Sequence, residues 1–334
     1  MSQEMNRRRF IKESLVASAA GTLALGSGRG ASAQDAAKGP VRATNTPVAT
    51  EAMPMGKLTG KLGNVQLSRL VLGCNHITHF IHSRDLTYVN DLAMHYNTET
   101  KIMETMAVAE QHGVNTIMMH NDPHGIPIVN KYINQHGGHI QRIVAPDPYS
   151  PEIDVYAEQI RRLADDGVCA MYVHGVHAER FLAEHNGDMI ARIVEAIMVH
   201  GKVPAGVAAH DLAVIEYCEK NKVGAEFYVK TFHHHNYPTA PKPEQLKDAI
   251  SEVPGYWCKD PKGTMDLMKG IAKPWIAYKV LAAGAIPPQN AFRYAFENGA
   301  DHVLVGMFDF EIAEDAKITR QIVAGLQRPR PWCS

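Results

Sequence analysis

Short apolar segments alternate with amphipathic stretches from Lys57 to the end of the chain. This alternation is typical of a parallel sheet with crossover helices. The predicted strands are Arg69–Asn75, Asn115–His120, Ile140–Asp147, Cys169–His174, Pro204–His210, Glu226–His233, Trp275–Gly284 and His302–Met307. Eight such units in about 270 residues match a single-domain (β/α)8 TIM barrel spanning residues 57–334. The alternative is a doubly wound open sheet. That fold would require a glycine-rich turn after the first strand, and Gly73-Cys74-Asn75-His76 is not such a turn.

The helices and the first segment of this region carry their own end signals. Thr98–His112 is followed by Gly113, Pro151–Asp166 by Gly167 and Pro288–Asn298 by Gly299. A glycine directly after a helix is a common stop signal. Lys57 to Ser68 is expected to form a small hairpin around Gly63-Asn64 that plugs one end of the barrel.

The amino terminus reads as an export signal. Arg7-Arg8-Arg9-Phe10-Ile11-Lys12 precedes a short apolar run, and Ala31-Ser32-Ala33 has the form of a cleavage site. Together they predict a twin-arginine signal peptide over residues 1–33, a flexible linker over 34–56 and a periplasmic or secreted enzyme. The twin-arginine export machinery is then a partner. The remaining chain has no apolar run long enough for a stable membrane insertion.

Charge and cysteine usage narrow the class further. The formal net charge is -1 and the pI is about 7.0, which argues against a nucleic-acid partner. The five cysteines contain no CxxC pair and do not form a disulfide or zinc-finger pattern. The sequence does not determine the oligomeric state, and a homo-oligomer is possible.

Polar residues end six of the eight strands. With alternation along each strand, the side chains predicted to point into the upper interior are Asn75, His120, His174, His210, Lys230 and Lys279. Buried lysines are costly unless they are paired or functional. Because active sites of TIM barrels lie at the carboxyl ends of the strands, this cluster predicts an active site.

Carbonyl chemistry suits this cluster. Burial and a neighbouring cation lower the pKa of a lysine, so Lys279 or Lys230 is predicted to act as a base or as a Schiff-base amine. His210 and His174 are predicted to move protons, and Asn75 to orient the substrate.

The same histidines allow a metal alternative. His120, His174 and His210 could supply three nitrogens to zinc, manganese or iron and leave a position for water. The chain would then be a metal-dependent hydrolase or lyase.

Further substrate contacts are expected on the loops after the strands. Two of these loops are long: His76 to Asn97, and His234 to about Gly263. The candidate substrate-binding residues are Arg84 and Asp85 in the first loop, His234 and Trp257 in the second, and Gly284 and Gly306 in small-residue turns of the kind that bind phosphate in many barrels.

Two resemblances add to these expectations. Leu67-Ser68-Arg69-Leu70-Val71-Leu72-Gly73, after a short hairpin, resembles the opening of aldo-keto reductases. That resemblance implies a nicotinamide-dependent oxidoreductase, but the second-strand aspartate and following tyrosine of that family are not found around Thr116–Asn121. The blocks His82–Leu86, Phe227–His234 and Lys273–Ala285 resemble an uncharacterised, twin-arginine-exported bacterial barrel family, to which no activity is attached.

The sequence therefore predicts an exported TIM-barrel enzyme of the lyase, aldolase or isomerase type. Its expected substrate is a small polar carbonyl compound derived from a sugar, as in carbohydrate metabolism. The alternatives are the metal-dependent enzyme, an aldo-keto-reductase-like oxidoreductase, and a non-catalytic sugar-binding barrel.

Overall fold

The computed structural model describes residues 58–334. The predicted signal peptide (1–33) and linker (34–56) lie outside the described residues. Eight parallel strands form a closed barrel in the order β10-β3-β4-β5-β6-β7-β8-β9, which confirms the predicted (β/α)8 fold. The strands are β3 (Leu70–Gly73), β4 (Thr116–His120), β5 (Gln141–Ala145), β6 (Ala170–Val173), β7 (Ala205–Ala209), β8 (Phe227–Thr231), β9 (Trp275–Tyr278) and β10 (His302–Val305).

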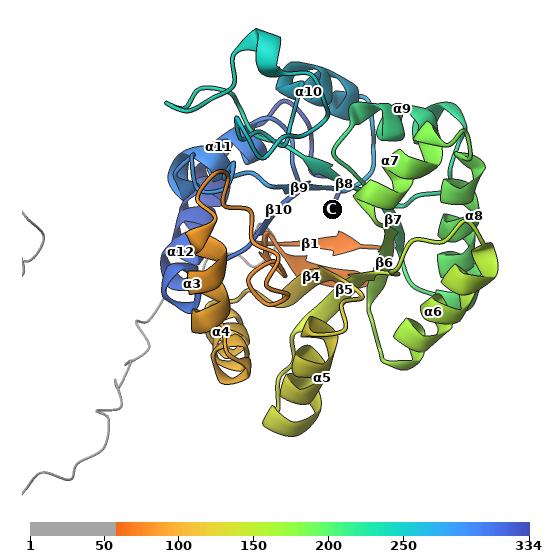
Figure 1. Cartoon of the computed structure of the whole chain (residues 1–334), viewed down its shortest axis with the longest axis horizontal. Coiled ribbons are helices and arrows are strands. Elements are labelled where there is room, and N and C mark those ends of the chain that lie inside the picture. The colour runs from red at the N-terminus through yellow and green to blue at the C-terminus, as the bar shows by residue number, and fades with distance from the viewer. Residues whose placement is uncertain (1–57) are drawn as a thin grey trace, which may run out of the picture. The chain divides into compact units, whose positions relative to one another are not determined.

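Helices surround the barrel on its outside (Figure 1). They are α3 (Tyr88–Tyr96), α4 (Glu99–Gln111), α5 (Gly125–His136), α6 (Ile153–Asp165), α7 (Gly175–Ala183), α8 (Asp188–Ala196), α9 (Leu212–Lys220), α10 (Pro261–Lys269), α11 (Pro288–Glu297) and α12 (Asp309–Gly325). A π-helical turn, Ile197–Gly201, extends α8, and a 3-10 turn, Pro243–Gln245, lies in the loop after β8. None of the helices in residues 58–334 has the length and apolar character needed to cross a membrane.

Helix ends follow the signals in the sequence. The Thr98 side chain accepts a hydrogen bond from the Lys101 backbone N–H at 3.3 Å and caps the start of α4. Gly113 and Gly299 have φ angles of 81° and 108°, a region that favours glycine, and they end the α4 and α11 segments. Local chemistry therefore accounts for these boundaries.

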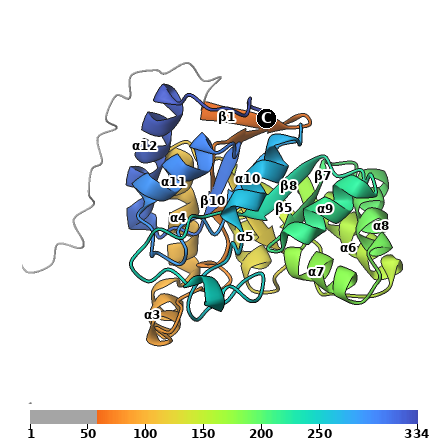
Figure 2. The same ribbon diagram turned by 90° about the horizontal axis from the view of Figure 1, so that it is seen from above.

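A hairpin closes one end of the barrel, as predicted. β1 (Thr59–Leu62) pairs with β2 (Val65–Ser68) in antiparallel register. Leu62 and Leu67 are buried in the cluster that fills the barrel interior, together with Val71 and Met118. Figure 2 shows β1 and the carboxyl terminus at one end of the barrel, and α3 at the opposite end.

The carboxyl-terminal tail is anchored at the hairpin end. The carboxylate of Asp301, which is 0 % exposed, pairs with Arg328 at 3.2 Å and with Arg330 at 2.8 Å. It also accepts the backbone N–H groups of Trp275 and Cys333 at 2.9 and 3.0 Å. All five cysteines are free thiols.

Two apolar layers show which way each strand faces. The interior cluster consists of Leu62, Leu67, Val71, Met118, Ile143, Ala145, Ala170, Tyr172, Ala208, Phe227, Val229 and Ile276. The predicted facing is therefore right for β4, β6 and β7. It is wrong for β8 and β9, because Phe227, Val229 and Ile276 point inward while Tyr228 and Ala277 pack against the helices. Both faces of a parallel strand are buried, so the apolar pattern of β8 and β9 does not tell inside from outside.

Candidate functional site

His210 and Glu179 form a hydrogen-bonded pair at the carboxyl end of the barrel. His210 follows β7, and Glu179 comes from α7. The Nδ1 of His210 lies 3.2 and 3.3 Å from the two carboxylate oxygens of Glu179. Glu179 also accepts the backbone N–H groups of His210 and Asp211, at 2.5 and 2.9 Å. These bonds fix the carboxylate, which in turn orients the imidazole with Nδ1–H toward it and the lone pair on Nε2.

Burial controls the charge state of this pair. Burial acts to raise the pKa of Glu179, but the hydrogen bonds from His210 and the backbone outweigh it and the pKa is lowered. Burial lowers the pKa of His210, against the opposing effect of Glu179. An ionised Glu179 beside a neutral His210 is the expected state near neutral pH. Neutral His210 is then suited to accept a proton.

Lys279 reaches the same region by a backbone turn. It follows Tyr278, the last residue of β9, and strand alternation would direct its side chain toward the helices. Its φ angle of 56° breaks the alternation. The Nζ of Lys279 instead contacts the Nε2 of His82. Burial lowers the pKa of Lys279 to about 8, against the opposing charges of Glu252 and Glu179. Lys279 therefore lies at the predicted end of the barrel. It reaches this position through the backbone turn and not, as predicted, through alternation along the strand.

Tyr278 contributes a hydroxyl group that the sequence prediction missed. Its ring centroid lies 5.4 Å from that of His210. The hydroxyl is buried and has no hydrogen-bond partner within residues 58–334. A side chain in place of Gly175 would bring its Cβ to 3.2 Å from this oxygen, so the glycine leaves room beside it. Burial raises the pKa of Tyr278 well above its usual value, so the group stays protonated and can donate a hydrogen bond.

Three further histidines extend the cluster across the barrel. The ring centroid of His174 lies 5.9 Å from that of His120 and 5.0 Å from that of His177. His177 is held by Asp147 at 3.0 Å through Nε2 and by the Tyr156 hydroxyl at 3.0 Å through Nδ1.

His174 itself is half-buried and neutral. Burial lowers the pKa of His174 to about 3. Its Nδ1 is buried without a hydrogen-bond partner in the described part of the chain. His174 thus offers a second polar atom that a bound substrate could satisfy.

Lys230 does not belong to this cluster. It is 1 % exposed, and its Nζ donates to the His210 carbonyl at 2.8 Å and to the carbonyl and hydroxyl oxygens of Thr231 at 3.1 and 2.9 Å. The prediction that it points into the barrel is wrong, because β8 presents Phe227 and Val229 to the interior. With three donors engaged by neutral oxygens, Lys230 ties the ends of β7 and β8 together.

The predicted metal ligands are not brought together. Within residues 58–334 no three His, Cys, Asp or Glu side chains lie close enough to hold one metal ion. His120, His174 and His210 therefore do not form the expected ligand set.

Arg84 and Trp257, two of the predicted substrate contacts, join the two long loops instead. Arg84 donates to the hydroxyl of Thr239 at 2.6 Å and to the Pro254 carbonyl at 2.7 Å. The Trp257 ring centroid lies 5.5 Å from that of His82. Asp85, by contrast, is exposed.

The other predicted contacts lie around the same end of the barrel. Asn75 is half-buried, and its Oδ1 lies 3.8 Å from the Cys74 Sγ. His234 packs edge-on against Tyr294 with ring centroids 5.0 Å apart. A Cβ at Gly306 would come within 2.7 Å of His76 Nδ1, so this glycine makes room for a histidine; Gly284, with φ 79°, has open space around it.

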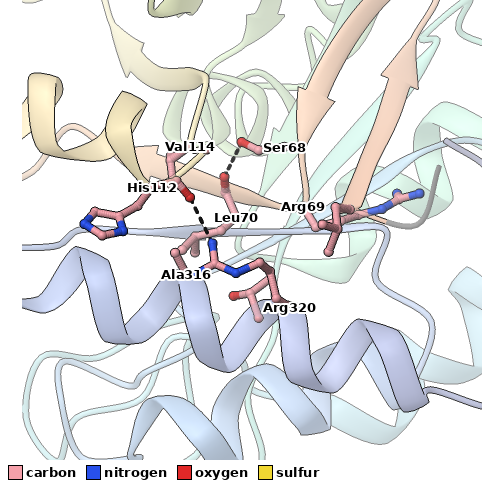
Figure 3. Close-up of a pocket in the computed structure, with 10 residues that line it drawn as sticks. Ser68, Arg69, Leu70, His112, Val114, Ala316 and Arg320 are labelled. Carbon is pink, nitrogen blue, oxygen red and sulfur yellow. Dashed lines mark hydrogen bonds between the residues drawn. The ribbon is translucent and has the colours of Figure 1, made fainter. Parts of the chain in front are cut away.

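Two cavities within residues 58–334 lie away from this cluster. The one in Figure 3, about 80 Å³, is lined by Leu70 at the start of β3, by the end of α4 and by α12, where Arg320 donates to the His112 carbonyl at 3.0 Å. Another, of about 330 Å³, lies beside the starts of β5 and β6 and is lined by Arg142 and Cys169. Both are at the amino-terminal ends of the strands, away from His210 and Lys279.

Comparison with known proteins supports the fold. No protein-family model matches the chain, and no curated protein is significantly similar to it. Solved structures are similar at low identity. A protein named as an aldo-keto reductase from Pseudomonas aeruginosa has a TM-score of 0.55 at 14 % identity, over 80 % of this chain and 95 % of that one. An aldo-keto reductase from Bacillus halodurans in its holo form has a TM-score of 0.51 at 11 % identity, over 80 % and 95 %.

A third similar structure is an aldo-keto reductase from a Medee basin deep-sea metagenome library, with a TM-score of 0.50 at 14 % identity, over 80 % of this chain and 96 % of that one. At such identities the likeness establishes the barrel fold. The resemblance to an uncharacterised exported family stays a prediction, since no family model matches.

Proposed function

We propose that this protein is an enzyme that moves protons at the carbonyl or hydroxyl group of a small polar, sugar-derived substrate. The observation that carries the proposal is the convergence of Lys279, Tyr278 and His210 at the carboxyl end of the barrel. Burial lowers the pKa of Lys279 to about 8, which suits proton transfer near neutral pH. The Tyr278 hydroxyl and the His174 Nδ1 supply buried polar atoms without partners in residues 58–334.

In an enolisation, the neutral Lys279 amine removes the proton next to the carbonyl, and the electron pair of that C–H bond forms the enolate. The Tyr278 hydroxyl donates a hydrogen bond to the carbonyl oxygen, where negative charge develops. His210, held by Glu179, accepts or returns a proton on the neighbouring carbon or hydroxyl. Return of the proton to the other carbon completes an isomerisation, and loss of a leaving group completes an elimination.

A Schiff base is an alternative use of the same lysine. The amine adds to the substrate carbonyl and water leaves, with protons supplied by neighbouring groups. Borohydride reduction would then fix the substrate to Lys279. An active enzyme that gives no adduct would exclude this variant.

An oxidoreductase is the second candidate. The three similar structures described above are named as aldo-keto reductases, which supports this class more directly than any comparison supports a lyase or isomerase. A tyrosine beside a lysine and a histidine also suits proton delivery to a carbonyl that is being reduced. However, β4 ends in Met119 and His120, without the aspartate and following tyrosine expected of that family. No step through a nicotinamide is therefore derived.

One experiment separates these reactions. The full-length protein is incubated with a panel of keto-sugars and aldoses in deuterated water, with and without reduced nicotinamide cofactors. Deuterium incorporation without cofactor supports enolisation, and cofactor oxidation supports the reductase. Lys279→Met is expected to abolish either activity, whereas Lys262→Met, at an exposed position, is the matched control. Saturable sugar binding without any turnover would refute the enzyme proposal in favour of a binding protein.

Export through the twin-arginine route and a periplasmic or secreted location are separate proposals. Both depend on residues 1–33. Cell fractionation of the full-length protein tests them: a cytoplasmic product that keeps its amino terminus would refute both.

A further inference from the structure

A chain of hydrogen bonds leads from the buried Lys279 amine to the protein surface. The Nζ of Lys279 contacts the Nε2 of His82, and the Nδ1 of His82 contacts Oε1 of Glu252. The side chain of His82 is 18 % exposed and that of Glu252 is 46 % exposed. Solvent access therefore increases from the imidazole to the carboxylate, which forms the surface end of the chain.

The donors and acceptors along this chain are consistent. A protonated Lys279 has only donors, so it must donate to the Nε2 of His82. His82 then carries its proton on Nδ1 and donates it to Glu252. Burial acts to raise the pKa of Glu252, but the hydrogen bond from His82 and the positive charge of Lys279 outweigh it and the pKa is lowered. The carboxylate at the surface end is accordingly ionised and can accept the proton.

Contacts between the two long loops hold this chain in place. His82 comes from the loop after β3, and Glu252 comes from the loop after β8. Arg84 bonds the second loop at Thr239 and Pro254. Gly255, with φ 94°, permits this contact, because a Cβ there would lie 2.5 Å from the Arg84 Nε. Residues 170 positions apart are thereby fixed across the site.

We propose that His82 and Glu252 are positioning residues that form a proton path between Lys279 and solvent. The role in turnover rests on the proposed function of Lys279. After Lys279 takes a proton from the substrate, its ammonium passes one proton to the Nε2 of His82. The Nδ1 proton moves to Glu252, and Glu252 releases it to water. The imidazole ends as the other tautomer, and transfer in the opposite direction restores it.

Other groups act on Lys279 from the surrounding elements. The carboxylate of Glu179 on α7 acts on its ammonium, and the charge of Lys279 in turn lowers the pKa of His210. Glu179 is already bonded to His210 and the backbone. Of the groups acting on Lys279, Glu252 is the carboxylate linked to it through His82, so its removal is the most direct test.

The test follows the Lys279 amine itself and needs no substrate. Full-length protein is labelled with 15N-lysine, and the Nζ signal is assigned by its loss in Lys279→Arg. The variants are Glu252→Gln and His82→Asn, and Glu244→Gln is the control at an exposed position of the same loop. In Glu252→Gln the pKa of Lys279 is expected to fall by about one unit, because an anion that favours the ammonium is lost.

Exchange of the Nζ protons with water separates a proton path from a simple tether. If His82 and Glu252 carry protons, both variants exchange at least about tenfold more slowly than wild type and Glu244→Gln, when each protein is measured at the same distance in pH from its own Lys279 pKa. If they only hold the loops together, their loss opens the site and exchange becomes faster. Unchanged or faster exchange therefore overturns the proposal. Added imidazole is expected to restore fast exchange in His82→Gly.

Two safeguards keep the result interpretable. Glu252 is partly exposed, so Glu252→Gln and its conservative partner Glu252→Asp can be measured even if substitution of His82 prevents folding. Glu252→Asp is expected to keep part of the fast exchange. If the proposed function is wrong, the exchange results still stand, whereas the substrate panel gives no turnover. The two failures are therefore distinguishable.

Discussion

Replacing Lys279 with methionine is expected to stabilise the protein near neutral pH. Burial lowers the pKa of the ammonium from 10.5 to about 8. This difference corresponds to a free-energy penalty of about 3 kcal/mol on the charged form in the folded state. Methionine has a similar length and carries no charge, so Lys279→Met removes the penalty.

The sign of the pH dependence follows from the lowered pKa. Below about pH 8 the lysine is protonated in both states, so the whole penalty weakens the fold. As the pH rises from about 8 to 10.5, the folded protein loses the proton before the unfolded chain does, and the penalty disappears. The free energy of unfolding of the wild type is therefore expected to increase between about pH 8 and pH 10.5, because the penalty at Lys279 is lost.

Urea unfolding of the full-length protein measures this effect. The stability advantage of Lys279→Met over wild type is expected to shrink by about 2 kcal/mol between about pH 7 and about pH 9.5. Changes in packing contribute equally at both pH values, so the difference between them reports the effect of the charge alone. Lys262→Met, at an exposed position, should show no such change. An advantage that stays constant or grows with pH would refute the lowered pKa and, with it, Lys279 as a base near neutral pH.

Three other substitutions test separate parts of the structure. Tyr278→Phe should lower kcat at least about 100-fold, because a hydrogen-bond donor to the substrate is lost; urea unfolding should show no loss of stability, because the hydroxyl has no partner within residues 58–334. A destabilised Tyr278→Phe, or one as active as the control Tyr217→Phe, would contradict this role. Glu179→Gln should lower the pKa of His210, moving the acidic limb of the pH–rate profile to lower pH, since Glu179 raises that pKa; an unmoved limb would exclude His210 as the titrating base. Asp301→Asn should destabilise the fold by about 3–5 kcal/mol, because two buried arginines lose their partner. A loss below about 1 kcal/mol in urea would show that this ion pair does not hold the tail.

The succession of strands and helices could be read from the sequence because it depends on local chemistry. Apolar runs, caps such as Thr98 and stops such as Gly113 act over a few residues. The facing of β4, β6 and β7 also followed from simple alternation. His174 and His210 accordingly lie where they were expected, at the carboxyl ends of β6 and β7.

Alternation failed where a strand is apolar on both faces or where the backbone turns. In β8 the sequence pattern fits either orientation, and packing of Phe227 and Val229 inside the barrel turned Lys230 away from the site. Lys279 entered the site through a positive φ angle that no sequence period indicates.

The partners of the site residues depended on tertiary structure alone. Glu179 meets His210 from a separate helix, and His82 meets Glu252 from a separate loop. Side chains far apart in sequence come together only when the barrel has closed and the loops have docked. The sequence by itself therefore determined the barrel and the end at which its chemistry lies. Which groups touch, and hence which protons can move, was decided by packing between distant segments, because hydrogen bonds depend on distances that a linear pattern does not contain.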